Sequence, residues 1–179
     1  MSTPKKPDAA KLVISVFMND KLLFDELLPA LEAAFGSTEQ ISDWFDFDYT
    51  DYYEGEMGSP LFRRMISFAA LIGQDDLARI KEATNAMEKN WAVNGQRNLN
   101  LDPGYLLLSR FVLATGKDFS HRIYIGRGIY AEVTLMFKKG KFHSLAWTYP
   151  DYASREMTDF LMGVRRGYVA DLKDETLNK

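Results

Sequence analysis

The sequence predicts a mixed α+β fold, in which helices and strands alternate at first and strands dominate afterwards. Hydrophobic residues recur at three- and four-residue spacing, typical of amphipathic helices, over 22–35, 75–91 and 154–172. Shorter segments between and after them alternate polar and apolar residues or are continuously apolar, as strands are. With 46% hydrophobic and 26% charged residues, the chain also has the composition of a globular domain that buries a core.

The first two expected elements are a strand and a helix. Residues 11–18, KLVISVFM, are a compact apolar run and predict a buried strand. Asp20 can cap the following helix over 22–35, and Gly36 should end it. Pro29 lies inside this helix and should kink or split it, because proline removes a backbone hydrogen bond.

Two strands and a second helix are expected next. Residues 41–49, ISDWFDFDY, alternate apolar and polar residues and predict a half-buried strand. Residues 61–72, LFRRMISFAALI, fit the helical and the strand period about equally. We favour a strand, because Gly73 and a capped helix follow closely. The helix over 75–91 has acidic residues in its first turn and one apolar face.

From Arg97 onward the apolar period shortens to that of strands. The expected strands are RNLNL, YLLLSRFVLAT, HRIYI, GIYAEVTLMF and KFHSLAW, with a hairpin turn at KKGK and a final helix over 154–172. The first six elements follow the order of a ferredoxin-like split β-α-β-β-α-β core, which further antiparallel strands and the C-terminal helix should extend. We expect residues 1–10 to be a flexible tail and 11–175 a single α+β domain.

Composition excludes several classes of protein. The net charge of −3 rules out a chain-wide basic field for nucleic acid and leaves room for a local cationic patch. The chain has no cysteine, which removes disulfides, thiol nucleophiles and thiolate metal sites. It has no 18-residue apolar stretch and no signal-peptide pattern, so we expect a cytoplasmic protein without a membrane partner.

The segment 117–132, KDFSHRIYIGRGIYAE, concentrates ionisable residues among strand-forming ones. One interpretation is a solvated hairpin with weak cross-strand ion pairs. The other is an anion site, in which Arg122 and Arg127 supply planar forks and Lys117 a point charge. His121 would then be its general acid or base.

Strand geometry adds detail to this segment. On a strand, His121 and Ile123 share one face while Arg122 and the next tyrosine share the other. Glu132, on the following strand, can pair with Arg122 or Arg127. The motif G-x-G-x-x-A at 126–131 is a dinucleotide fingerprint only where a helix begins, and the alternating run that follows favours a hairpin turn.

Two other segments carry candidate residues. Asp102, Pro103 and Gly104 have the chemistry of a turn that ends a strand, in which Asp102 either accepts backbone amides or contacts a ligand. In FDFDYTDYYEGEM, strand alternation explains the first acids without any function. The later acids lie in an expected loop, where paired carboxylates could bind Mg²⁺, although the spacing lacks the glycine and glutamate of an EF-hand.

The stretches DYTDYY, NLDPGYL, ATGKDFSHRIYIGRGIYAEVTL and WTYPDY occur in this order. They resemble an uncharacterised prokaryotic family, a domain of unknown function, some of whose members carry the label "GTP-binding protein". The resemblance covers about residues 11–168 and implies no catalytic residues. It implies GTP as one candidate ligand, but the chain has neither a phosphate loop nor an N-K-x-D motif.

The leading hypothesis is a protein that binds an anionic small molecule, phosphorylated or a nucleotide among the candidates. If it is an enzyme, we expect phosphoryl or acyl hydrolysis by His121 beside a carboxylate, with Mg²⁺ as the candidate cofactor. The alternative is a non-enzymatic adaptor or homo-oligomerising domain that binds protein through aromatic loops. The candidate residues are His121 and Asp102 for catalysis, Lys117, Arg122, Arg127, Tyr105, Glu132, Asp51 and Tyr52 for the ligand, and Asp48 and Asp51 for a metal.

Overall fold

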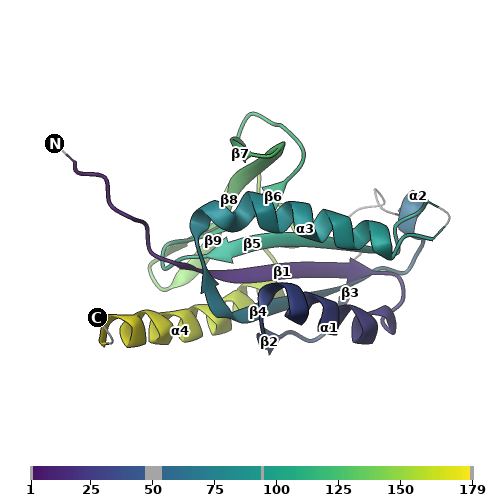
Figure 1. The fold of residues 1–179 in the computed structure, drawn as a ribbon, viewed down its shortest axis with the longest axis horizontal. Coiled ribbons are helices and arrows are strands. Elements are labelled where there is room, and N and C mark those ends of the chain that lie inside the picture. Colours follow the sequence, from purple (N-terminus) through teal and green to yellow (C-terminus); the bar gives the residue numbers. More distant parts are fainter. Residues whose placement is uncertain (1, 47–53, 94, 178–179) are drawn as a thin grey trace.

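The computed structural model describes residues 2–46, 54–93 and 95–177, and these form an antiparallel sheet with helices on both faces (Figure 1). The mixed α+β fold is therefore confirmed. The strands are β1 (Ala10–Met18), β2 (Thr38–Ile41), β3 (Phe45–Asp46), β4 (Phe62–Ile72), β5 (Leu99–Leu106), β6 (Arg110–Thr115), β7 (Ile123–Gly126), β8 (Ile129–Lys138) and β9 (Lys141–Ser144). The α-helices are α1 (Leu23–Phe35), α2 (Glu54–Met57), α3 (Leu77–Asn90) and α4 (Arg155–Leu177).

The strands follow the order β2-β4-β1-β5-β6-β8-β7, with β3 also paired to β4 and β9 to β8. β1 lies antiparallel between β4 and β5. The ambiguous segment 61–72 is strand β4, as favoured from the sequence. The ferredoxin-like description of the first six elements stays a prediction, because the sheet continues through β6, β8 and β7 without a break.

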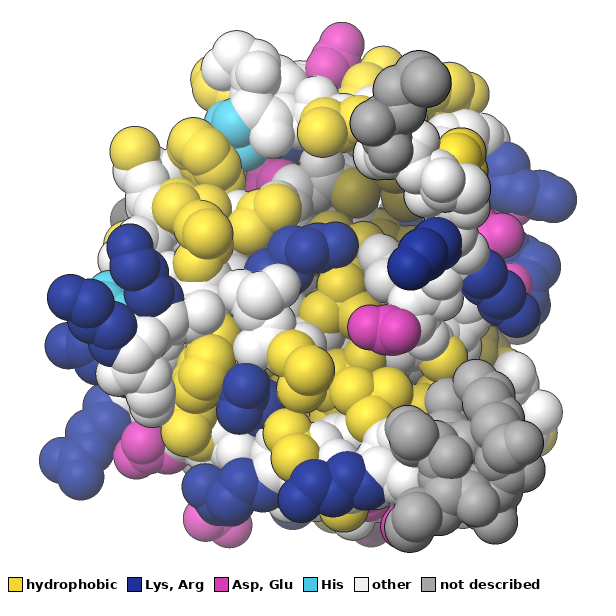
Figure 2. Space-filling view, turned by 90° about the vertical axis from the view of Figure 1, so that its left-hand side faces the viewer, with side chains coloured by type: hydrophobic (Ala, Val, Ile, Leu, Met, Phe, Trp, Pro, Cys, Tyr) yellow, Lys and Arg dark blue, Asp and Glu magenta, His cyan; other side chains and the backbone are white. Residues whose placement is uncertain are grey.

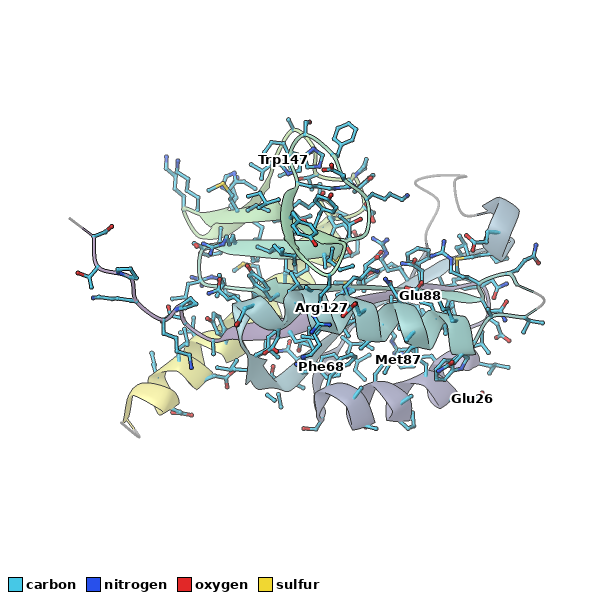
Figure 3. The ribbon with its side chains drawn as sticks, turned by 45° about the horizontal axis from the view of Figure 1, so that its top comes forward. Glu26, Phe68, Met87, Glu88, Arg127 and Trp147 are labelled. Atoms are coloured by element: carbon cyan, nitrogen blue, oxygen red, sulfur yellow. The ribbon has the colours of Figure 1, made fainter. Side chains whose placement is uncertain are left out.

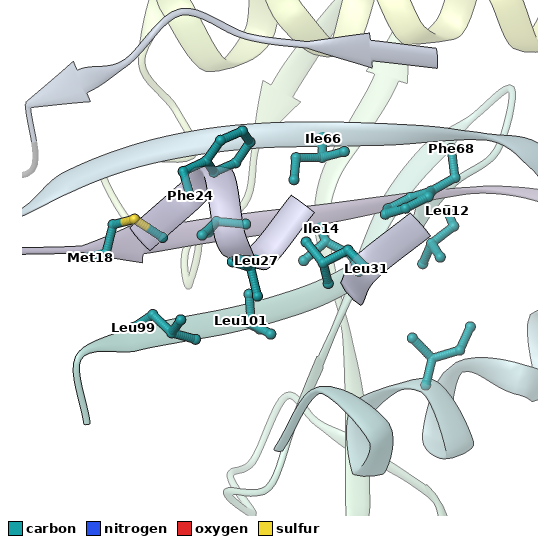
Figure 4. Close-up of a cluster of buried hydrophobic side chains, with 12 residues drawn as sticks. Leu12, Ile14, Met18, Phe24, Leu27, Leu31, Ile66, Phe68, Leu99 and Leu101 are labelled. Atoms are coloured by element: carbon teal, nitrogen blue, oxygen red, sulfur yellow. The ribbon is translucent and has the colours of Figure 1, made fainter. Parts of the chain in front are cut away.

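β1 is buried along its whole length because both faces of the sheet are covered (Figure 1). Successive side chains of a strand point to opposite faces. Leu12 and Ile14 accordingly belong to the core under α1 and α3, while Val13 belongs to the core with α4. Figure 4 shows the first core, to which α1 contributes Leu27 and Leu31 from one helical face. This apolar stripe explains why the segment folds as a helix in spite of Pro29 within it.

The expected strand over 41–49 is interrupted, so that part of the prediction was wrong. β2 ends at Ile41, and the next strand that pairs with β4 is β3, although the Ser42 amide still donates to the Met65 carbonyl at 2.9 Å. Between them, the Ser42 hydroxyl accepts a hydrogen bond from the Met65 amide at 2.9 Å and donates one to the Asp43 carbonyl at 2.6 Å. A serine side chain thus replaces the backbone in the ladder and breaks the strand. Residues 47–49 lie outside the described residues.

The interpretation of Asp102-Pro103-Gly104 as a turn was also wrong. All three lie inside β5, paired with β1, and Pro103 faces Ile14. The backbone N–H and C=O of Leu101 both bond to side chains of α3, so they point away from β1. Pro103, two residues further, presents its missing N–H to the same outer edge, where a strand tolerates proline.

This outer edge is open because β5 and β6 diverge. They pair only through Gly104 opposite Leu113, Tyr105 opposite Val112 and Leu106 opposite Phe111. At Gly104 the two strands approach so closely that a Cβ atom would collide with the Val112 carbonyl oxygen. Beyond this pair the strands separate, and we call the gap between them the fork. The segment expected as one strand over 105–115 therefore contains the β5–β6 turn.

Both predicted hairpin turns are confirmed. Arg127 has φ of 57° between two glycines of positive φ, and strand β8 follows, which agrees with a turn instead of a helix N-terminus. Lys139 and Gly140 make the β8–β9 turn in the same way. The last helix begins at Arg155, one residue after the predicted start at 154, and extends beyond the predicted end at 172, to Leu177.

Figure 2 views the molecule from the side that lies at the left of Figure 1. Hydrophobic side chains are exposed down the middle of this face, and a dense group of lysine and arginine side chains lies at one margin. A local cationic area thus exists on a chain whose net charge is −3. None of the helices in the described ranges combines the length and the apolar character needed to cross a membrane.

Candidate functional site

A pocket of about 760 Å³ occupies the fork between β5 and β6. Its walls come from β4, α3, β5, the end of β6, the segments around Lys117 and Glu132, and the turn before α4. The lining residues are Arg63, Lys81, Asn85, Glu88, Arg97, Asn100, Asp102, Leu113, Ala114, Thr115, Gly116, Lys117, Arg122, Glu132, Tyr149, Pro150, Asp151 and Tyr152. We call this cavity the fork pocket.

Two charged side chains of α3 close the open edge of β5 and form one wall of the pocket. Lys81 Nζ donates to the Leu101 carbonyl at 2.7 Å and contacts Asp102 Oδ1 at 3.3 Å. Glu88 Oε1 accepts the Leu101 amide at 2.8 Å. The two side chains thereby take the place of the missing strand partner. Both are buried, together with Leu77 and Thr84, in one stripe of the helix.

Burial raises the pKa of Glu88 above its ordinary value, although the nearby Lys81 charge and the Leu101 amide oppose that change. Arg97 supports the same carboxylate from outside the helix, with Nη1 3.3 Å from Glu88 Oε2. Two further Arg97 bonds, both 2.7 Å long, form a bidentate pair with Glu56. These bonds lower the pKa of Glu56. One guanidinium therefore joins two carboxylates whose pKa values shift in opposite directions.

Two buried hydrogen-bond donors of the pocket wall have no partner in the described part of the chain. Asn100 accepts from Arg97 Nη1 at 2.9 Å through Oδ1, while its Nδ2 makes no hydrogen bond. The Tyr152 hydroxyl lies near the Ser15 hydroxyl, but the two make no hydrogen bond of good geometry. Burial raises the pKa of Tyr152, so this hydroxyl remains protonated and able to donate.

Arg63 and Asp151 form a buried ion pair at the base of the pocket. The Arg63 guanidinium lies 5.4 Å from the Phe17 ring centre and 5.1 Å from that of Tyr152. Aromatic faces on a cation and a carboxylate at its edge hold the guanidinium in one orientation. Arg63 comes from β4 and Asp151 from the turn before α4, so the pair also joins that turn to the sheet.

On the β8 side of the pocket, the Glu132 carboxylate contacts the Arg122 guanidinium and the His121 imidazole. Its Oε2 accepts from Arg122 Nε at 2.7 Å and lies 3.1 Å from His121 Nε2. Arg122 Nη1 also donates to the Lys117 carbonyl at 3.1 Å. His121 stacks on Trp147, with ring centres 5.1 Å apart and planes at 9°. The Trp147 indole in turn donates to the Val133 carbonyl at 2.8 Å.

The structure corrects the predicted orientation of His121 and Arg122. Both precede β7, in the turn before the strand, so the alternation of strand faces does not apply to them. They point to the same carboxylate instead of opposite faces. The predicted pairing of Glu132 with Arg122 is present, whereas Arg127 pairs with Glu82 at 2.8 Å on the surface.

Four of the residues predicted from sequence line the fork pocket: Asp102, Lys117, Arg122 and Glu132. His121 is not among the lining residues and contacts Glu132. Arg127 and Tyr105 are not lining residues either, and burial raises the pKa of Tyr105, which packs beside Leu107 and Tyr168. Asp48, Asp51 and Tyr52 lie outside the described residues.

Sequence reasoning missed most of the other polar lining residues, among them Arg63, Lys81, Glu88, Asn100 and Asp151. One signal was available for two of them. Lys81 and Glu88 are seven residues apart and share the buried stripe of α3 with Leu77 and Thr84, where a solvated face is not expected. For Arg63 and Asn100, strand alternation predicts the face of the sheet but not the element that covers it, and Asp151 lies in a turn, where no such pattern exists.

The candidate metal ligands can be assessed only in part. Among the described residues, no group of three or more histidine, aspartate or glutamate side chains is placed to hold a metal ion. The two predicted metal ligands, Asp48 and Asp51, fall in the range left undescribed. A Mg²⁺ site therefore stays a prediction.

Comparisons with curated proteins and with solved structures give no match. A family model, in contrast, matches residues 8–168, which include every described residue of the fork pocket. The chain therefore belongs to the DUF4416 family, a domain of unknown function.

Proposed function

We propose that the protein is a cytoplasmic protein that binds a small anionic molecule in the fork pocket, with phosphorylated metabolites and nucleotides as the candidate ligands. The observation that carries the proposal is the pair of buried, unpartnered donors, Asn100 Nδ2 and the Tyr152 hydroxyl, in a pocket that also contains several cations. A buried donor without a partner costs about 1–3 kcal/mol. A ligand with acceptor oxygens would remove that cost at both positions.

The charges of the lining residues favour an anion. Five lining residues are cationic and four are carboxylates, which leaves a net charge of +1 (5 − 4) before any ligand binds. The carboxylates are engaged within the wall: Glu88 with Arg97 and Leu101, Asp151 with Arg63, and Glu132 with Arg122. A further anionic group is therefore better accommodated than a further cationic one.

The cations are held in place before a ligand arrives. Arg122 is fixed by Glu132 and by the Lys117 carbonyl, and Arg63 by Asp151 and two aromatic rings. A fixed guanidinium loses little conformational entropy when it binds a phosphate or carboxylate. Lys117 is exposed at the rim of the pocket, where its positive charge attracts an incoming anion.

Binding is better supported than hydrolysis. His121 Nε2 contacts Glu132, and its ring is stacked on Trp147, so the imidazole lies behind the pocket wall. Within the pocket, Asp102 lies 3.3 Å from Lys81 and is one of the two carboxylates beside it, with Glu88. Phosphoryl or acyl hydrolysis by His121 and Asp102, with or without Mg²⁺, remains a prediction for the step after binding.

The test is a thermal-shift and calorimetric panel of nucleotides, sugar phosphates and di- and tricarboxylates, each with and without Mg²⁺. A ligand present at 100 times its Kd should stabilise the fold by about 2.7 kcal/mol. Lys117→Ala should weaken its binding about tenfold or more, because a charge-assisted hydrogen bond contributes about 1.5–3 kcal/mol. Asn100→Leu should weaken binding as well.

Lys141→Ala is the matched control, because Lys141 is an exposed lysine on β9 outside the pocket. It should bind like the wild type. The proposal is wrong if no compound in the panel stabilises the protein, or if Lys117→Ala and Asn100→Leu bind the stabilising compound as well as Lys141→Ala does.

A further inference from the structure

β7 is the last strand on the path of the sheet, and one of its edges has no strand beside it in the described structure. It is also exposed on both faces: Ile123 is 72% exposed, Tyr124 58% and Ile125 37%. Proteins normally protect such edges with lysine, proline, a bulge or a covering segment. The sequence IYIG has no lysine or proline. A register shift between Tyr124 and Gly126 interrupts its pairing with β8, but the apolar side chains remain on the surface.

Neighbouring residues extend this exposed apolar area. Phe119, 63% exposed, lies 5.3 Å from the His121 ring, which in turn stacks on the exposed Trp147. Figure 3 shows Trp147 on the same projecting part of the molecule as β7 in Figure 1. We call this area the β7 surface, and its exposed members are Phe119, Ile123, Tyr124, Ile125, Trp147 and Tyr149.

Two arginines, one at each end of the β7 strand, are already paired within the chain. Arg122, before the strand, binds the buried Glu132, and Arg127, after it, binds Glu82. A strongly charged partner therefore finds little unpaired complementary charge at the two ends of the strand. Two copies of the chain, in contrast, can meet along this strand without repulsion between these arginines, because each is neutralised by a carboxylate of its own chain.

The size of the β7 surface suits a partner of similar size. With side chains of about 150–250 Å² each, the exposed fractions sum to roughly 600 Å² of apolar area. The largest apolar patch of a typical monomer is about 300–600 Å², and a standard interface buries about 800 Å² on each partner. The backbone of the free β7 edge and the polar residues around the β7 surface would supply the rest of the buried area. In a dimer with a two-fold axis, the β7 surface of one copy would be buried against the same surface of the other.

We propose that the β7 surface is a homodimer interface, in which the β7 strands of two copies pair antiparallel and the sheet continues from one subunit into the other. The apolar side chains on both faces of β7 pack against the partner's equivalents on each side of the joined sheet. This interface is separate from ligand binding in the fork pocket, although Tyr149 belongs to the margin of both. If no compound in the thermal-shift panel binds, the proposal of a dimer is unaffected. If the chain is a monomer, the proposal of a ligand in the fork pocket is unaffected.

The first test measures the mass of the full chain in solution by light scattering and sedimentation across a wide concentration range. The wild type should have twice the chain mass of 20.5 kDa. Ile123→Lys and Tyr124→Lys, which place a charge on the strand edge, should give the monomer with an unchanged circular-dichroism spectrum. Met136→Lys is the matched control, because Met136 is an exposed apolar residue on β8 beyond the segment that pairs with β7. It should remain a dimer.

The second test uses the absence of cysteine from the chain. A single Tyr124→Cys or Ile125→Cys substitution should give a disulfide-linked dimer on mild oxidation, because paired strands bring Cα atoms within the roughly 4.4–6.8 Å that a disulfide requires. Leu22→Cys, at another exposed site, should not. A wild-type chain that is monomeric at every concentration would overturn the proposal. So would a dimer that survives Ile123→Lys and cross-links equally well through Leu22→Cys.

Discussion

The core under α1 and the fork pocket are both bounded by β5, but they are built from different kinds of contact. Leu99 and Leu101 of β5 pack into the first with Leu27 and Leu31 of α1, and every member is apolar. Asn100 and Asp102, the alternate residues of the same strand, face the second. One strand therefore separates an apolar region from one that contains several ion pairs.

The difference matters because substitutions in the two regions should change the free energy of unfolding in different ways. Apolar packing is non-directional, so it tolerates a change of shape when volume is conserved. A buried ion pair contributes little net stability, but removal of one partner leaves an uncompensated charge. The ion pairs of the fork pocket therefore hold charged groups in defined positions but contribute little to the free energy of unfolding. We infer that the apolar core supplies the stability that this arrangement requires.

The largest effect on stability is expected for Arg63→Met. The substitution leaves Asp151 buried without its cation, which costs about 3–5 kcal/mol. Urea denaturation of the variant measures this change in the free energy of unfolding. The double variant Arg63→Met, Asp151→Leu should recover much of the loss, because it removes both charges.

Leu27→Met in the apolar core is the matched control. It conserves volume at a fully buried position, so the loss should be below about 1.5 kcal/mol. Equal losses for Arg63→Met and Leu27→Met would contradict the distinction between the two regions.

An intermediate effect concerns pH. Burial raises the folded-state pKa of Glu88 above its ordinary value of 4.5, so the folded protein binds this proton more tightly than the unfolded chain. The resulting stability is present below the unfolded pKa and is lost as pH rises through the folded one. The free energy of unfolding of the wild type, relative to Glu88→Gln, should therefore fall as pH rises above about 4.5. One pKa unit corresponds to about 1.4 kcal/mol.

Glu56 provides the opposite case on the same guanidinium. Hydrogen bonds from Arg97 lower its pKa, so its contribution is present above its ordinary pKa of 4.5 and is lost as pH falls through the lowered value. Glu56→Gln should destabilise the protein most at neutral pH. Denaturation curves between pH 3 and 8, roughly the range in which carboxyl groups and their shifted values titrate, would separate the two. Parallel pH profiles for the two variants would refute the assignment.

The smallest effect is expected outside both regions, at the exposed pair Arg127–Glu82. A double-mutant cycle with Arg127→Ala and Glu82→Ala should give a coupling energy of about 0.2–1 kcal/mol, further reduced by salt. A larger coupling that persists in high salt would show that this hairpin pair contributes more than a solvated surface pair. It would also bring Arg127 back as a functional candidate.

Much of the fold could be predicted because it depends on local patterns. The apolar run of β1, the periodicity of α1, α3 and α4, and the two glycine turns each occupy a short stretch whose preferences agree with the final structure. The errors came where a side chain or a distant strand decided the outcome. Ser42 interrupts a strand by bonding to β4, and Pro103 lies within β5 because its missing N–H faces the fork.

Only one wall of the candidate site could be predicted from the sequence. Lys117, Arg122 and Glu132 lie close together in sequence, and strand pairing brings them to one wall of the pocket. Asp102 was chosen for an incorrect reason, as a turn residue, and nevertheless lines the pocket from within a strand. Lys81 could have been chosen from its place in the buried stripe of α3, whereas Asp151 could not, because a charged residue in a turn does not show from the sequence whether it will be buried.

The sequence by itself determined the class of fold, the helices and most strands, the two hairpins and the concentration of charge beside β7. These follow from the spacing of apolar residues and from the backbone preferences of glycine, which act over a few residues. Only the tertiary structure decided that β5 and β6 separate beyond Gly104 and that residues from distant segments, between Arg63 and Tyr152, line the resulting cavity. The physical reason is that burial and ion pairing depend on which surfaces the chain brings into contact, and those contacts join residues far apart in the sequence.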